Sequence, residues 1–255
     1  ANFASLPLNH TVKKLFLIGA ISLAVTGANA SSPYASVLTT SGDRSQQLTE
    51  SEVEPAGTST TDDAIVITDR TAQEIDGFGA AITGSTAYNL LKMEPEARTA
   101  FLKKTFSTTE GYGMSYIRIC IGCSDFSLSE YTCCDTEGIE NFALTAEETQ
   151  YVIPVLKEIL AINPDIKIMG SPWTAPLWMK VSDLSTLSPC NSWTGGYLNP
   201  AHYGDYAQYF VKWIKAFADN GIRIHAVTLQ NEPLNRGNSA RCSWDGSSSA
   251  TSSKS

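Results

Sequence analysis

The residues most able to do chemistry follow four strand-like runs, at the point where each run ends. The clearest is Glu232, which follows the run "AVTLQ" and stands between Asn231 and Pro233. A glutamate can transfer a proton, an asparagine can hydrogen-bond a ligand, and tryptophan rings offer an apolar face. The sequence therefore predicts one rim that combines acid, hydrogen-bonding and stacking groups. The other three runs end at Asp76 and Phe78, at Arg118 to Asp125, and at Trp173 and Trp178.

The runs that position these residues alternate with helix-like segments. Strands are predicted near residues 75, 117, 168 and 228, and amphipathic helices over 144–164 and 201–221. This alternation is typical of βα units around a parallel sheet. Four such units are half of a (β/α)8 TIM barrel, an α/β fold whose chemistry gathers at the C-terminal ends of the strands. We therefore predict roughly the first four βα units of a TIM barrel.

Local signals support both helices. Thr145 and Glu148 have the T-x-x-E spacing of a capping box at the start of the first helix, and Pro154 should kink or loosen that helix. Asn220-Gly221 should end the second helix. The face of the second helix predicted to enter the core carries Tyr203, Tyr206, Phe210, Ile214 and Phe217, and Phe78 is also assigned to the core.

The N-terminus predicts export from the cell. Lys13 and Lys14 precede the apolar run 15–25, which is too short to span a membrane, and Ala28-Asn29-Ala30 fits the A-x-A cleavage pattern. We expect cleavage after Ala30, a secreted or periplasmic product, and no integral membrane segment after cleavage.

The remaining chain divides by composition. Residues 1–30 are upstream residues and the signal peptide, and residues 31–63 are a Ser/Thr-rich linker or irregular arm. Residues 64–240 form the barrel portion, which begins with strand 64–68. Residues 241–255 are a low-complexity tail that we expect to be non-native.

Charge and cysteine usage narrow the partners. A formal net charge of -8 argues against nucleic acid as a ligand. Cys120 and Cys123 have C-x-x-C spacing and Cys133 and Cys134 are adjacent, but no histidine stands near either pair. We therefore predict no metal site, and instead buried thiols with one loop disulfide at most. No cofactor is predicted either.

Four ordered motifs, "DGFGAAITGS", "YIRICIGCSDFS", "SPWTAPLWMK" and "LQNEPLN", closely resemble glycoside hydrolase family 30, the glucosylceramidase-like β-glycosidases. The resemblance covers about residues 64–240 and implies a retaining glycosidase on a (β/α)8 barrel with a flanking β-domain. It implies that Glu232 is the general acid/base and that a carbohydrate or glycoside is the substrate. The implied substrate-binding residues are Asn231 at the sugar 2-hydroxyl, Asp125 at the glycone hydroxyls, Trp173 and Trp178 at the sugar pocket, and Arg118 beneath the nucleophile.

One family feature is missing from the pattern. The nucleophile of the family is a second glutamate at the end of the seventh strand, and no residue of this chain can be assigned that role. Glu130, Glu137 and Glu140 lie in a predicted loop. We expect the 255-residue chain to be truncated before that strand, to lack turnover and to be prone to self-association through open sheet edges.

Other interpretations remain open. The chain could be a non-catalytic carbohydrate-binding protein that uses Trp173, Trp178 and Asp125. Within the enzyme class, a β-xylosidase, an endo-xylanase and a β-1,6-glucanase would use the same residues. Taken singly, Arg118 fits a buried ion pair, Asp125 fits a cap, and either tryptophan fits a core.

Overall fold

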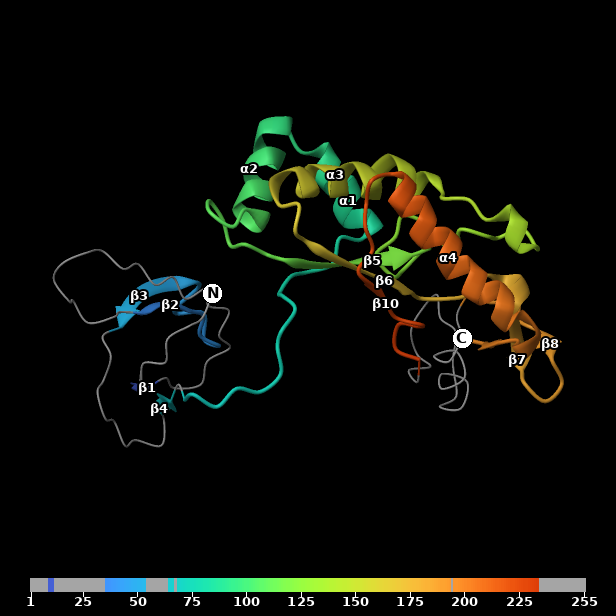
Figure 1. The fold of residues 1–255 in the computed structure, drawn as a ribbon, viewed down its shortest axis with the longest axis horizontal. Helices are drawn as coiled ribbons and strands as arrows, with labels where there is room; N and C mark the ends of the chain where they lie inside the picture. The colour runs from blue at the N-terminus through green and yellow to red at the C-terminus, as the bar shows by residue number, and fades with distance from the viewer. Residues whose placement is uncertain (1–8, 12–34, 54–63, 67, 194, 234–255) are drawn as a thin grey trace. The chain divides into compact units, whose positions relative to one another are not determined.

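The computed structural model describes residues 9–11, 35–53, 64–66, 68–193 and 195–233 (Figure 1). The predicted export signal over 12–30 and the predicted tail over 241–255 lie outside these residues. The chain divides into two compact units, Ala1–Ile75 and Asp76–Ser255. Within the described part of the chain, no helix is both long enough and apolar enough to cross a bilayer.

The described residues of the first unit form two antiparallel strand pairs. Strand β1 (Asn9–Thr11) pairs with β4 (Ala64–Val66), in agreement with the strand predicted to start at residue 64. Strands β2 (Ala35–Thr39) and β3 (Thr49–Val53) form a hairpin. Residues 35–53 are therefore not the linker or irregular arm that the composition predicts.

The hairpin is hard to recognise because β3, with the sequence TESEV, is mostly polar. The turn between the two strands is held by Asp43, whose Oδ1 accepts hydrogen bonds from the Ser45 amide at 3.0 Å and the Ser45 hydroxyl at 2.8 Å. The Ser41 hydroxyl also donates to Asp43 Oδ1. This bond first, and then the two from Ser45, lower the pKa of Asp43 to about 2. Turn chemistry rather than hydrophobic alternation thus accompanies the pairing.

The second unit is built on a parallel sheet. Strands β5 (Tyr116–Ile121), β6 (Lys167–Pro172) and β10 (Ala226–Val227) lie in the order β10-β6-β5. Ala81 forms an isolated parallel bridge with Arg118 on the other side of β5. The sheet therefore has four parallel positions in chain order, which is the arrangement of a partial (β/α) barrel.

The first of these positions is not the regular strand predicted near residue 75. The amides of Ser115 and Tyr116 donate to the Phe78 carbonyl at 2.9 and 3.1 Å, so the segment runs beside β5 without full pairing. A Cβ on Gly79 would lie 1.4 Å from the Tyr116 carbonyl oxygen, so only glycine allows this approach. Phe78 is 73% exposed, so its assignment to the core is wrong.

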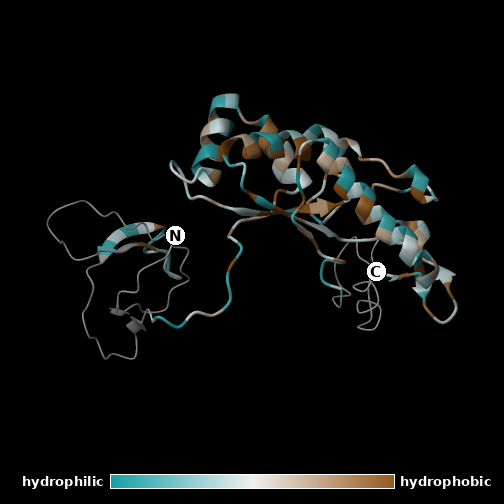
Figure 2. Cartoon of the chain, viewed as in Figure 1, coloured by the Kyte–Doolittle hydropathy of each residue, from teal (hydrophilic) through white to brown (hydrophobic). Residues whose placement is uncertain are grey.

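Helices of the second unit cover one face of this sheet (Figure 1). They are α1 (Gly84–Lys92), α2 (Pro95–Phe106), α3 (Ile153–Ile162) and α4 (Tyr203–Asp219). Apolar residues gather where the helices face the strands (Figure 2). The largest side chains that are completely or almost completely buried there include Ile117, Ile119, Leu156, Ile159, Ile168, Tyr209, Trp213 and Phe217.

The predicted helix signals are present. The Thr145 amide and hydroxyl donate to Glu148 Oε2 at 2.8 and 2.6 Å, although the first turns become a π-helix, η2 (Glu148–Val152). Pro154 follows within α3, so the wider turns lie where its ring would otherwise crowd the preceding carbonyl. Helix α4 ends with Asn220 as its C-cap, as predicted.

A small antiparallel sheet that the sequence analysis does not predict lies between β6 and α4. Its order is β8-β7-β9, with β7 (Lys180–Asp183), β8 (Ser188–Pro189) and β9 (Tyr197–Leu198). Three short 3-10 helices also lie outside the main layers: η1 (Ile139–Asn141), η3 (Leu177–Met179) and η4 (Pro200–His202).

Candidate active site

Two of the predicted site residues meet around a third, Arg118. Its Nη2 donates to Ser171 Oγ and to Asn231 Oδ1, each at 2.7 Å. Its guanidinium carbon lies 4.6 Å from the centre of the Trp173 ring, a distance at which a cation is attracted to the ring face. Arg118, Trp173 and Asn231 are 113 residues apart at most, and parallel pairing brings them together.

Backbone bonds fix the register of this cluster. The Thr228 amide donates to the Gly170 carbonyl at 3.0 Å, and the Asn231 amide donates to the Pro172 carbonyl at 2.8 Å. The hydroxyls of Ser171 and Thr228 are 2.6 Å apart. The chain after β10 therefore follows β6 beyond the regular strand, and this places Asn231 beside the end of β6.

One donor of Arg118 is left over. Its Nε is buried and has no hydrogen-bond partner among the described residues. A buried donor without an acceptor costs free energy, roughly 1–3 kcal/mol and more for a charged group. Such a group is a natural site for an incoming acceptor, above all a carboxylate, which matches guanidinium geometry.

Glu232 follows directly after this cluster. It has a φ of 45°, in the left-handed region that side chains other than glycine rarely adopt. Unusual backbone of this kind is concentrated at functional sites. Glu232 is exposed, and among the described strands β10 has a neighbour on one side only.

Asp125 lies on the loop after β5, two residues beyond Cys123, which packs with Trp173. It is exposed, while the loop backbone around it is firmly held. The Ser85 amide donates to the Phe126 carbonyl at 3.0 Å, and the Leu128 amide donates to Glu147 Oε2 at 2.9 Å. The role of Asp125 at a sugar stays a prediction.

Asp76 is not part of the rim. Its carboxylate is paired with the Lys167 ammonium at the start of β6. The Arg118 partners lie at the other end of that strand, so Asp76 belongs to the N-terminal end of the sheet.

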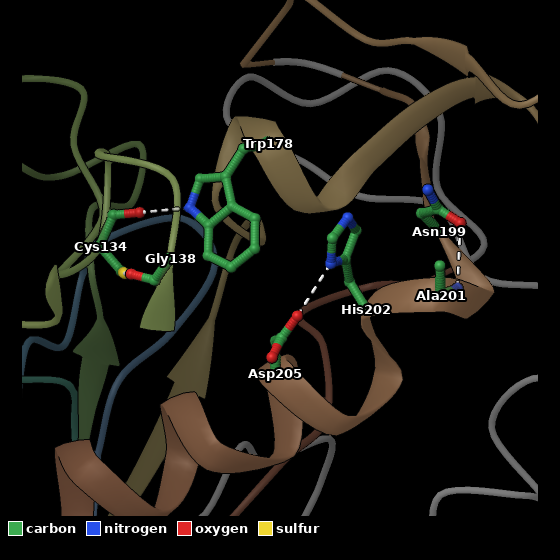
Figure 3. Close-up of polar contacts among 7 residues, drawn as sticks. All are labelled: Cys134, Gly138, Trp178, Asn199, Ala201, His202 and Asp205. Atoms are coloured by element: carbon green, nitrogen blue, oxygen red, sulfur yellow. Dashed lines mark hydrogen bonds and ion pairs between the residues drawn. The ribbon is translucent and has the colours of Figure 1, made fainter. Parts of the chain in front are cut away.

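Trp178 is also separate from Arg118. It lies on η3, and its indole N-H donates to the Cys134 carbonyl at 2.9 Å (Figure 3). Its ring meets the His202 ring edge-on at 5.1 Å, and His202 Nδ1 lies 2.9 Å from Asp205 Oδ2. Trp178 lines a hollow of about 220 Å³ beside the small sheet, and none of Arg118, Trp173 and Asn231 lines that hollow. Its role as a sugar-binding residue stays a prediction.

The cysteines near the site are protonated thiols at neutral pH. Burial raises the pKa of Cys120 to about 12 and that of Cys123 to about 11. All five described cysteines are free, and the described residues contain no group of three or more His, Cys, Asp or Glu side chains that could hold a metal ion.

Several residues of this region are absent from the sequence prediction. Ser171 connects Arg118 to β6, and Glu147 holds the Asp125 loop. Lys180, the first residue of β7 in the small sheet, is almost fully buried. Ser171 is part of the motif "SPWTAPLWMK", which could have indicated its importance. Lys180 is the last residue of the same motif. Glu147 lies outside the four motifs, and the Leu128 amide that it accepts is a backbone group, which leaves no signal in the sequence.

Comparisons with known proteins agree with this geometry. Residues 75–244 match the model of the glycosyl hydrolase family 30 TIM-barrel domain. The chain is 35% identical to mouse lysosomal acid glucosylceramidase over 169 residues, which cover 63% of this chain and 31% of the mouse protein. It is 36% identical to endo-1,6-beta-D-glucanase of Neurospora crassa over 169 residues, which cover 64% of this chain and 34% of the fungal one.

Solved structures give a closer comparison. The endo-β1,6-glucanase BT3312 has 55% sequence identity and a TM-score of 0.74, over 85% of this chain and 47% of its own. Xylanase C of Talaromyces cellulolyticus has 25% identity and a TM-score of 0.56, over 71% of this chain and 42% of its own. The chain thus spans about a third of the curated relatives and about half of these solved structures. Because the family model matches most of the sequence, this chain belongs to glycosyl hydrolase family 30.

Proposed function

We propose that this chain supplies the proton donor and part of the sugar site of a retaining β-glycosidase. The observation that carries the proposal is the cluster of Arg118, Trp173 and Asn231 at the strand ends, immediately before Glu232. Retaining glycosidases need one carboxyl group that protonates the leaving oxygen and a second that attacks the anomeric carbon. Glu232 is the proposed proton donor.

The hydrogen bonds within the cluster determine which atoms of Asn231 and Arg118 remain to bind a ligand. Asn231 accepts from Arg118 through Oδ1, so its amide Nδ2 is the atom that donates to a sugar hydroxyl. Arg118 keeps its Nε for a carboxylate, which is where the nucleophile of a complete site would be held. No described residue supplies that carboxylate, so we propose that the chain alone lacks turnover.

We propose β-1,6-linked glucan as the substrate. The 55% identity to the endo-β1,6-glucanase BT3312 extends over 85% of this chain, whereas the 35% identity to mouse glucosylceramidase extends over 63%. This favours the β-1,6-glucanase alternative over a glucosylceramide or xylan substrate. We also propose export of the protein, on the strength of the Lys13 to Ala30 pattern.

The test is a hybrid enzyme in which residues 1–233 of this chain are followed by the remainder of BT3312. Hydrolysis of β-1,6-glucan and of an aryl β-glucoside is measured for the 255-residue chain and for the hybrid. We expect activity in the hybrid alone. A folded hybrid that hydrolyses neither substrate contradicts the proposed function, and so does hydrolysis by the short chain.

The role of Glu232 is tested by Glu232→Gln in the same hybrid. Loss of a general acid should lower kcat/KM on β-1,6-glucan by about 10²–10⁴-fold. The loss should be smaller on aryl glycosides, whose leaving groups need less protonation. Glu130→Gln, on the exposed loop after β5, is the matched control. Equal rates for Glu232→Gln and its parent on β-1,6-glucan would refute the assignment.

A further inference from the structure

Trp193 lies on the segment between β8 and β9 and packs beside the Arg118 site. Trp173 forms a small apolar cluster with Cys123 and Tyr131, and Trp193 packs against that cluster. Trp173 is 9% exposed, whereas Trp193 is only partly buried. The more accessible indole of the pair therefore offers apolar area at the edge of the site.

A buried ammonium group fixes the segment that carries Trp193. Lys180 is 2% exposed, and its Nζ donates to the Ser192 carbonyl at 2.8 Å and to the Trp193 and Gly195 carbonyls at 3.4 Å. The same Nζ donates to Thr174 Oγ1 at 2.9 Å. One side chain thus connects the end of β6 to the backbone on both sides of the Trp193 ring.

The turn that follows is equally constrained. Gly196 has a φ of 80°, and a Cβ at this position would lie 2.7 Å from Cys190 Sγ and 3.2 Å from the Val181 carbonyl oxygen. Only glycine fits both the left-handed backbone and the space. The path of the chain from Gly196 into β9 is therefore specified by the sequence.

Burial of the Lys180 ammonium is unfavourable for stability, which suggests that the loop it holds has a function. Burying an ammonium removes its hydration shell, and several hydrogen bonds are needed to offset the loss. In this segment the bonds hold a loop whose largest side chain is Trp193. A rigid indole is a suitable surface for a sugar, because its apolar face packs on C-H groups at little entropic cost.

We propose that Trp193 contacts a glucose unit of the bound glucan, next to the unit at Trp173 and Arg118, and that Lys180 is the residue that positions Trp193. The inference rests on the proposed function and adds a sugar-contacting residue and its support. Lys180 itself does not touch the substrate. Its effect should therefore pass through Trp193.

The experiment uses the hybrid enzyme and a series of β-1,6-linked gluco-oligosaccharides. Trp193→Ala should raise KM by about tenfold on the longer oligosaccharides and change kcat little, since the lost contact stabilises bound substrate and transition state alike. Lys180→Met should raise KM in the same direction. The double variant should be no worse than Trp193→Ala, which a general loss of stability at Lys180 would not produce. Phe101→Ala, an exposed aromatic on α2, is the control.

Binding supplies a second measurement that does not depend on turnover. Titration of the same oligosaccharides into the hybrid and the 255-residue chain is followed by indole NMR signals, with folding checked by circular dichroism. If the parent binds or hydrolyses and Trp193→Ala does so equally well, the inference is wrong while the proposed function stands. Additive losses in the double variant remove Lys180 as the positioning residue. A parent that neither binds nor hydrolyses overturns the proposed function and this inference together.

Discussion

Arg118 and Lys180 are two cationic side chains in neighbouring parts of one unit, and they use their hydrogen-bonding capacity differently. Arg118 reaches side chains from two other strand ends and stacks on Trp173, yet its buried Nε has no partner among the described residues. Lys180 bonds to oxygens of a single stretch, from Thr174 to Gly195. One group joins distant segments and keeps a free donor, whereas the other closes a local loop.

This difference indicates that Arg118 is available to bind a ligand, whereas Lys180 stabilises the backbone of a loop. An unpaired buried donor is unfavourable for stability, so folding alone gives no reason to keep one. A lysine surrounded by loop oxygens satisfies its donors at once and stabilises one backbone path. The contrast predicts opposite effects of mutation: Arg118 should matter most for activity and Lys180 most for stability.

The largest expected effect is that of Arg118→Met on activity. The substitution removes two charge-assisted hydrogen bonds and the donor kept for the nucleophile, and each such bond contributes about 1.5–3 kcal/mol. In the hybrid enzyme, kcat/KM on β-1,6-glucan should fall at least about a hundredfold, because about 1.4 kcal/mol corresponds to a factor of ten. The measurement is steady-state kinetics.

The same variant tests the comparison through its stability. Ser171 keeps its bond to Thr228 when Arg118 is gone, and the unsatisfied Nε is removed. The urea midpoint of Arg118→Met should therefore change less than that of Lys180→Met. A variant that unfolds more readily than Lys180→Met but keeps its kcat/KM would reverse the contrast.

The next effect is that of Lys180→Met on the free energy of unfolding. The methionine fills a similar volume but leaves the buried Thr174 hydroxyl and the part-buried loop carbonyls without their donor, at a cost of about 1–3 kcal/mol. Urea denaturation at neutral pH measures the loss. Lys212→Met on α4, a partly buried lysine of that helix, is the matched control. Equal midpoints for Lys180→Met and its parent would show that the loop is held by other contacts.

The sequence predicts the parallel sheet and the Arg118 cluster for a physical reason. Strands β5 and β6 and helices α3 and α4 bury apolar residues at regular spacing, which periodicity reveals. Parallel strands end on the same side of a sheet, so residues after β6 and β10 must lie together. Arg118, Trp173 and Asn231 therefore meet as expected.

The parts that the sequence does not predict are held by polar or local contacts. In the β2–β3 hairpin, β3 is mostly polar, and a hydrogen-bonded turn around Asp43 joins the two strands. The support of Trp193 comes from main-chain carbonyls around Lys180, and any residue type carries such carbonyls. Trp173 and Trp178 look equivalent in the motif, yet they have different contacts. The Trp173 ring lies against the Arg118 guanidinium, whereas the Trp178 indole N-H donates to the Cys134 carbonyl.

The smallest expected effect is that of Glu147, a buried carboxyl group that can be compared with the cations Arg118 and Lys180. It is 6% exposed and accepts the Leu128 amide at 2.9 Å, so it supports the Asp125 loop as Lys180 supports the Trp193 segment. Burial nevertheless raises its pKa above the usual 4.5, an effect that the Leu128 bond opposes. Hydrogen bonding therefore offsets only part of the cost of burying this charge.

A raised pKa in the folded state gives a definite sign to the pH dependence. The folded protein favours the protonated carboxyl, so the contribution of Glu147 to stability is full below its unfolded pKa and is lost as pH rises through the folded value. Glu147→Gln stays neutral and lacks this loss. The stability of the variant relative to its parent should therefore increase from about pH 4 to about pH 8, as measured by urea midpoints. Glu110→Gln, an exposed glutamate after α2, is the control. A relative stability that stays constant or decreases over this range would mean that the Leu128 bond fully offsets the burial of the charge, and that Glu147 belongs with the satisfied groups such as Lys180.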